Sequence, residues 1–258
     1  MFCRIILLAF SAAWMVVPAL GQREHKSLTI SVSAAVDVLI TNADGKRVGR
    51  DLVKDQTYSE IAGADVRRLP GRQPIYEVPV GPSNKPLTIM IFGRETTKNV
   101  DLSITGPNFV FGVNDIQFEK EAVITVGIAP NGSLLRYSST IVSATPRISL
   151  AIDPTDSKKP SYIFDIHRNP MEKGENLSVF HTGETYFGFG DNSKSLATYE
   201  LKIKRINADG GGGEFNRAEL KAKRANNFLV DLTKWSAVSL PCLRADDDAK
   251  GVTKAQCH

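Results

Sequence analysis

Apolar and polar residues alternate along most of the chain with a period of two. In residues 28–32, for example, Leu28, Ile30 and Val32 alternate with Thr29 and Ser31. This period is that of a β-strand with one buried face. The same pattern predicts further strands at 36–40, 75–80, 87–91, 100–104, 122–126, 134–137, 148–152, 162–166, 177–180, 186–189, 199–206, 215–220 and 228–232.

Turn-forming residues separate these runs and favour an all-β fold. Residues 42–45 (Asn-Ala-Asp-Gly) and 210–213 (four glycines) are typical of tight or flexible turns. No capped apolar stripe of helical period is present, although 54–62 could hold one helical turn and 218–225 has a helix-favouring composition. Short strands with regular turns predict β-sandwiches or barrels.

Strand spacing and a break at 143–146 predict two consecutive β-sandwich domains after a signal peptide. The expected division is 1–21 signal peptide, 22–143 first sandwich, 146–235 second sandwich and 236–258 a short irregular tail.

The N-terminus is typical of a cleaved secretion signal. Arg4 precedes an apolar run from Ile5 to Leu20, and Ala19 and Gly21 place small residues at the −3 and −1 positions of a cleavage site. The run is shorter than the roughly 20 apolar residues of a spanning helix. We therefore expect a secreted or periplasmic protein with no membrane span in the mature chain.

Charge does not favour a nucleic-acid partner. Arg4 is the one charged residue of residues 1–21, so removing them lowers the net charge from +4 to +3. The densest basic stretch consists of Lys202, Lys204, Arg205, Lys221, Lys223 and Arg224. Without interleaved exposed aromatic residues, this pattern predicts solvated strand faces rather than a nucleic-acid site.

Two cysteines, Cys242 and Cys257, remain after removal of the signal. Export takes them out of the reducing cytosol, so a disulfide within the tail is expected, with two free thiols as the alternative. Closing a loop of about 15 residues would stabilise the chain by about 3 kcal/mol in the chain-entropy treatment.

One hairpin carries the candidate binding residues. Tyr186 and Phe187 are aromatic, and Glu184 and Asp191 flank them with carboxylates. A sugar could stack on the rings while a carboxylate accepts a hydroxyl hydrogen bond, and paired carboxylates also serve glycosidic hydrolysis. The alternative is that the phenylalanines fill a core and Glu184 caps a turn.

Other chemistries have weaker signals. His167 and His181 could meet across a hairpin, but no histidine pair has metal-ligand spacing. Calcium ligands could come from Asn42, Asp44 and Asp51, or from Asp153, Asp156 and Asp165, but neither set has a full calcium-loop pattern. No nucleophile motif is present. We therefore expect no catalytic residues, no metal and no cofactor.

Residues 36–49 resemble the opening of an Ig-like β-sandwich module of bacterial secreted and surface proteins. The resemblance continues through 60–64 and the Gly-Pro of 105–107, but Asp65 stands where such modules often have an aromatic residue. The second half is similar to a small repeat-type β module of exported proteins, through 199–206, 209–215 and Trp235. Such modules serve as spacers, accessory domains or interaction domains.

Together these features predict a non-enzymatic, exported β-sandwich protein that acts as an interaction or structural module at the cell envelope or outside the cell. Its partner would be a protein or a glycan, contacted through loops or an exposed edge strand. The alternatives are a carbohydrate-binding module using Tyr186 and Phe187, and a secreted hydrolase.

Overall fold

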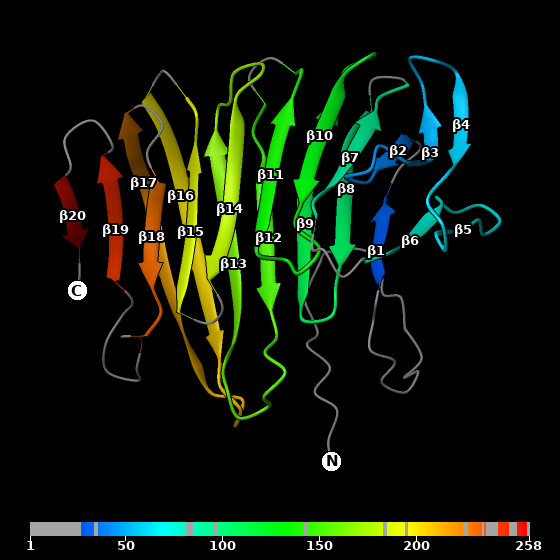
Figure 1. Ribbon diagram of the computed structural model, residues 1–258. Helices are drawn as coiled ribbons and strands as arrows, with labels where there is room; N and C mark the ends of the chain where they lie inside the picture. The colour runs from blue at the N-terminus through cyan, green and yellow to red at the C-terminus, as the bar shows by residue number, and fades with distance from the viewer. Residues whose placement is uncertain are drawn as a thin grey trace.

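The computed structural model is built of β-strands packed as two antiparallel sheets (Figure 1). It describes residues 27–33, 36–80, 85–94, 97–141, 144–182, 185–193, 196–223, 227–233, 235, 242–247 and 252–256, and none of these is helical. The all-β class predicted from the alternation is confirmed. Residues 56–59 and 212–223, where helix was the alternative, are strands.

Nine strands form the sheet that we call sheet A. In spatial order they are β17 (Gly212–Lys223), β16 (Leu196–Ile206), β13 (Ser161–Asn169), β12 (Arg147–Ile152), β9 (Phe109–Phe118), β8 (Thr97–Thr105), β1 (Ser27–Val32), β6 (Ile75–Pro79) and β5 (Asp65–Arg67).

Eleven strands form sheet B. In spatial order they are β20 (Val252–Gln256), β19 (Cys242–Asp247), β18 (Asn227–Asp231), β15 (Tyr186–Asp191), β14 (Asn176–Thr182), β11 (Leu134–Ser139), β10 (Val123–Ile128), β7 (Leu87–Phe92), β2 (Asp37–Thr41), β3 (Arg47–Asp51) and β4 (Gln56–Ser59).

From β8 onward the chain adds one hairpin at a time, alternately to sheet A and sheet B. The hairpin β8–β9 belongs to sheet A, β10–β11 to sheet B, β12–β13 to sheet A, and so on to β18–β19. The first strands of the sheet A hairpins begin at Thr97, Arg147 and Leu196, a spacing of about 50 residues. The chain thus advances steadily from one end of the sandwich to the other, as the colours in Figure 1 show.

Both sheets cross the point where the sequence predicted a domain boundary. On either side of 143–146, β9 pairs with β12 in sheet A and β11 pairs with β14 in sheet B. One buried apolar cluster extends from Leu28 to Trp235. Sheet pairing and the buried core are therefore continuous across this point, and the division into the domains 22–143 and 146–235 stays a prediction.

Alternation along each strand builds this core. In β13 the side chains of Tyr162, Phe164 and Ile166 are buried, while those of Ile163 and Asp165 on the opposite face are only partly buried. Each large apolar side chain buried in this way stabilises the fold by about 1.5–3 kcal/mol.

The tail predicted to be irregular forms strands instead. β19 pairs with β18 from Asp231↔Cys242 to Asn227↔Asp246, and β20 pairs with β19. The physical reason is that β18 would otherwise end sheet B with a row of unpaired backbone groups. Cys257 and residues 1–26 lie outside the described residues, so the disulfide and the signal peptide stay predictions.

Within the described ranges, no helix has the length and apolarity needed to cross a membrane.

Candidate functional site

The predicted aromatic platform on β15 is not formed. Tyr186 and Phe187 are consecutive residues of a strand, so their side chains point to opposite faces of sheet B. Tyr186 is 37% exposed, whereas Phe187 is fully buried and stacks on Phe164 with ring centroids 3.8 Å apart. A sugar therefore has no flat surface on which to contact both rings.

The carboxylates predicted for the same site also lie apart from a ligand surface. Asp191 is buried at the end of β15, with its side chain 2% exposed. Glu184 lies outside the described residues. Three of the four predicted binding residues are described, and they do not share a surface. Tyr186 is exposed, Phe187 lies in the core and Asp191 is buried.

Asp191 instead belongs to a buried group that we call the ionic cluster, made of Arg168, Glu175, Asp191 and Tyr199. The Nε atom of Arg168 lies 2.6 Å from Oδ2 of Asp191, and Nη2 donates a hydrogen bond of 2.7 Å to Oε2 of Glu175. The hydroxyl of Tyr199 donates to Oδ2 of Asp191. The Arg168 side chain is 1% exposed, so these contacts replace its water.

The ionic cluster joins the two sheets. Arg168 lies on β13 and Tyr199 on β16, both in sheet A, whereas Asp191 ends β15 in sheet B and Glu175 directly precedes β14. An arginine buried without carboxylates would carry an uncompensated charge, which costs several kcal/mol. The cluster therefore couples the packing of the two sheets at this point.

Burial and neighbouring charges shift the pKa values of Tyr199, Glu175 and Arg168. Desolvation and the adjoining Asp191 carboxylate raise the pKa of Tyr199 far above its ordinary value, so its hydroxyl stays protonated. Burial opposes ionisation of Glu175, but hydrogen bonds from Ser193, the Glu172 backbone and Arg168 outweigh it and lower its pKa. For Arg168, desolvation is outweighed by Asp191 and Glu175, and its pKa is raised. At neutral pH Arg168 is therefore charged, Glu175 is ionised and the Tyr199 hydroxyl is neutral.

Sequence reasoning missed Arg168, Glu175 and Tyr199 as members of a site. A signal was present in the alternation, because Arg168 follows Phe164 and Ile166 on the inward positions of β13. Asp191 follows Phe187 and Phe189 in the same way on β15. Opposite charges on the inward positions of two strands indicate a buried pair.

The structure separates the remaining candidate ligands. His167 lies on β13 in sheet A, with Nδ1 3.9 Å from Glu200, while His181 lies on β14 in sheet B. Asp165 accepts a hydrogen bond from Ser149, and Asp153 accepts one from Ser161. In the described part of the chain, no three His, Cys, Asp or Glu residues are placed to hold a metal ion.

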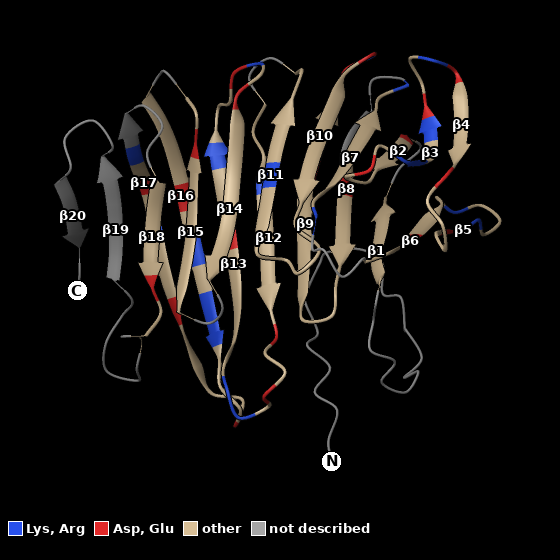
Figure 2. Ribbon diagram, in the orientation of Figure 1, with Lys and Arg blue, Asp and Glu red and all other residues tan. Residues whose placement is uncertain are grey.

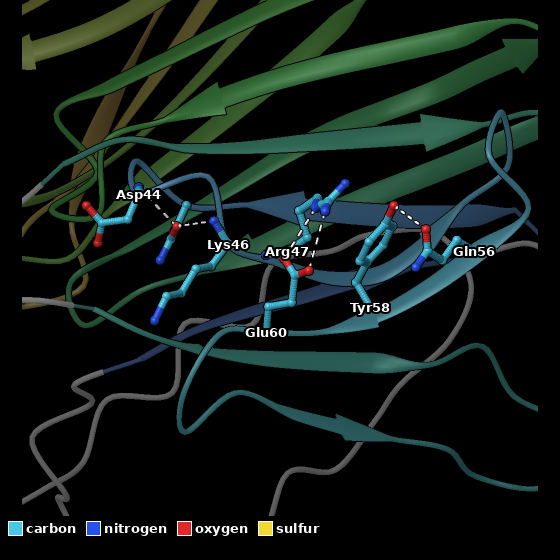
Figure 3. Close-up of polar contacts among 7 residues, drawn as sticks. Asp44, Lys46, Arg47, Gln56, Tyr58 and Glu60 are labelled. Carbon is cyan, nitrogen blue, oxygen red and sulfur yellow. Dashed lines mark hydrogen bonds and ion pairs between the residues drawn. The ribbon is translucent and has the colours of Figure 1, made fainter.

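The turn that carries the family resemblance is a well-formed polar turn (Figure 3). The side chain of Asn42 accepts hydrogen bonds from the backbone N–H groups of Asp44 and Lys46, and Gly45 adopts a φ of 76°. Asn42 thus uses its oxygen within the turn, as its sequence context predicted.

Beyond this turn, Arg47 of β3 forms an ion pair with Glu60, which directly follows β4, and stacks on the ring of Tyr58 in β4 (Figure 3). Arg47 forms two side-chain hydrogen bonds with Glu60, each 3.3 Å long, and its guanidinium lies 3.6 Å from the ring centroid of Tyr58. Hydrogen bonding by Arg47 lowers the pKa of Glu60. The pair lies at an exposed edge, where an ion pair contributes little to stability because water screens the charges.

The ends of the sheets differ in the strands they present. At the N-terminal end the outermost strands, β4 and β5, have four and three residues. At the C-terminal end sheet A ends in β17, which has 12 residues, and sheet B ends in β20. Short edge strands resist the addition of another strand, whereas a long one offers a row of backbone donors and acceptors.

No protein-family model, curated protein or solved structure matches this chain.

Proposed function

We propose that the chain is an exported, non-catalytic β-sandwich protein that acts as an interaction or structural module at the cell envelope or outside the cell. The leader of residues 1–21 supports export. The all-β sandwich supports a module that presents surfaces rather than a deep reaction site.

The observation that carries this proposal is the hairpin-by-hairpin growth of two continuous sheets. Each hairpin from β8 onward contacts its neighbours along the same two sheets, as units do in repeat proteins. Such an architecture separates its two ends and leaves an edge strand of each sheet at each end. The ionisable residues of the ionic cluster are engaged with one another.

Export is tested by fusing residues 1–26 to a reporter enzyme that is active only outside the cytosol. Reporter activity that depends on an intact apolar run is expected, and replacing Leu7 and Leu8 with Arg should abolish it. Equal activity of the two fusions would contradict export by this leader.

Interaction is tested with fluorescently labelled protein, purified after export and added to the cell-envelope material of its own host. Saturable binding that unlabelled protein displaces is expected. Absence of such binding, together with turnover of a glycoside, ester or peptide substrate by the pure protein, would overturn the proposal in favour of a hydrolase.

A further inference from the structure

The free edge of sheet A is formed by β17, the longest strand of the molecule. In the described part of the chain, β16 is its one ladder neighbour, and its other side is unpaired. The hairpin closes with a hydrogen bond from the Asn207 N–H to the Gly211 carbonyl. Hydrogen-bonded pairs alternate along an antiparallel ladder, so Glu214 and Asn216 direct their N–H and C=O groups to the free side. The Asn216 carbonyl accepts a long hydrogen bond of 3.4 Å from the Arg217 guanidinium, which an added strand would replace.

Sheet B extends past this edge. Figure 1 shows β19 and β20 beyond β17, at the far C-terminal end of the sandwich. The core is closed at β17 by Trp235, whose backbone carbonyl accepts a 2.5 Å hydrogen bond from Arg205 and whose indole lies against Gly213. A strand added about 4.8 Å from β17 would therefore lie beneath the projecting strands of sheet B, about 10 Å away.

The strands β19 and β20, which extend past β17, limit what can bind at the free edge of sheet A. If two copies paired through β17, the β19–β20 strands of both copies would enter the same layer and the same space. A single extended segment meets no such obstacle. The shape therefore favours strand addition by a peptide segment over pairing with a second copy.

The charged residues near the edge indicate which side chains such a segment would carry. Lys202 and Lys204 of β16 stand opposite Asn216 and Glu214 on the outer face, and Lys221 follows on β17. All three lysines are exposed, and within the described residues none forms a salt bridge. Figure 2 shows the resulting basic band on β16.

The inward positions of the edge carry two apolar residues, Phe215 and Leu220, and one charged residue, Arg217. Phe215 is buried and Leu220 packs partly against the core, so an added strand would place every second side chain beside them. Arg217 covers the ring of Phe215 at 4.8 Å.

We infer that β17 is a docking edge for one extended segment of a partner protein in which apolar and acidic side chains alternate. This inference rests on the proposed function and names its binding site. The apolar side chains would lie beneath β19–β20. The acidic ones would lie on the outer face, beside Asn216 and Lys221 of β17 and one strand away from Lys202 and Lys204 of β16.

A matched pair of variants tests the backbone contact. Asn216→Pro removes one outward N–H without removing a hydrogen bond to β16, and the residue before it is already extended. Asn216→Ala removes the same side chain but keeps the N–H group. Thermal unfolding confirms that both variants fold.

The probe is a fluorescent, end-capped peptide of about eight alternating valine and glutamate residues, measured by anisotropy. We expect it to bind the wild-type protein and Asn216→Ala with affinities within about twofold, and Asn216→Pro about tenfold more weakly. A valine–lysine peptide should bind more weakly than the valine–glutamate peptide.

Equal binding of the peptide to both variants, or no binding to the wild-type protein, would overturn the inference. So would a dimer seen in sedimentation that Asn216→Pro alone abolishes, because the edge would then belong to a second copy. If labelled protein binds the host envelope and Asn216→Pro binds equally well, the proposed function stands and the docking edge fails. Absence of saturable envelope binding by the wild-type protein would contradict both the proposed function and the docking edge.

Discussion

Replacing Asp191 with Asn should be among the most damaging single changes in the molecule. The substitution keeps the shape of the side chain but removes the charge that lies 2.6 Å from Nε of Arg168. Both side chains are at most 2% exposed, so water cannot replace the lost partner. Two unit charges about 4 Å apart attract by about 4 kcal/mol at an effective dielectric constant of about 20.

Glu175 still neutralises part of the Arg168 charge, with a hydrogen bond of 2.7 Å. We therefore expect Asp191→Asn to lower the free energy of unfolding by about 3 kcal/mol, near the low end of the range for breaking a buried pair. For a chain of this size that corresponds to a fall in Tm of about 10 °C.

The assay is urea unfolding followed by tryptophan fluorescence, with Asp191→Asn compared with the double variant Arg168→Met, Asp191→Leu. Replacing the charged pair with apolar side chains removes the Arg168 charge together with Asp191, and Glu175 keeps its hydrogen bond from the Glu172 N–H, so the double variant should recover part of the loss. A loss below about 1 kcal/mol for Asp191→Asn, or a double variant less stable than the single one, would refute the reasoning.

Other positions give independent tests of the fold. Phe187→Ala should lower the free energy of unfolding by about 3–5 kcal/mol because it empties a core site, and Tyr186→Ala by less than about 1 kcal/mol; similar urea midpoints for the two would contradict the assigned faces. Gly49→Ala should lower the free energy of unfolding by about 1–3 kcal/mol, because φ is 107° and a Cβ would lie 2.1 Å from the Val38 carbonyl oxygen. The loss should exceed that of Gly45→Ala, where a Cβ would have no atom within 4 Å, and a lower Tm for Gly45→Ala than for Gly49→Ala would argue against this backbone. The pKa of Glu175 is lowered in the fold, so its stabilisation is present above its ordinary value of 4.5 and is lost as the pH falls through the lowered value; Glu175→Gln should flatten the pH dependence of stability in this acid range, and an unchanged pH profile would count against the ionic cluster.

The strand pattern was predictable because one face of nearly every strand is buried. Where Leu28, Ile30 and Val32 alternate with polar residues, burial follows the alternation position by position. The register between strands was not predictable, because an alternating run fits beside any other alternating run. The residues at 143–146 therefore did not predict that β9 pairs with β12 and that β11 pairs with β14 across this point.

The recurrence of a sheet A hairpin about every 50 residues also escaped sequence analysis. Inward positions need only be apolar and of suitable size, so a repeated strand order need not appear as a repeated sequence. The prediction that Tyr186 and Phe187 form one binding surface failed for a different reason. Neighbouring residues on a strand point to opposite faces, and the alternation already placed Phe187 with Phe189 in the core. The same rule, applied to Arg168, would have predicted the ionic cluster.

Hydrogen exchange at the backbone amides of Glu214 and Asn216 most directly tests the claim that this exported sandwich binds a partner through its free edge. In the protein alone these outward amides should exchange quickly, and adding the host's envelope material should protect them while Tyr186 on the outer face of sheet B is unaffected. Protection confined to the sheet faces or loops, with both edge amides still exchanging at the free rate, would contradict the account.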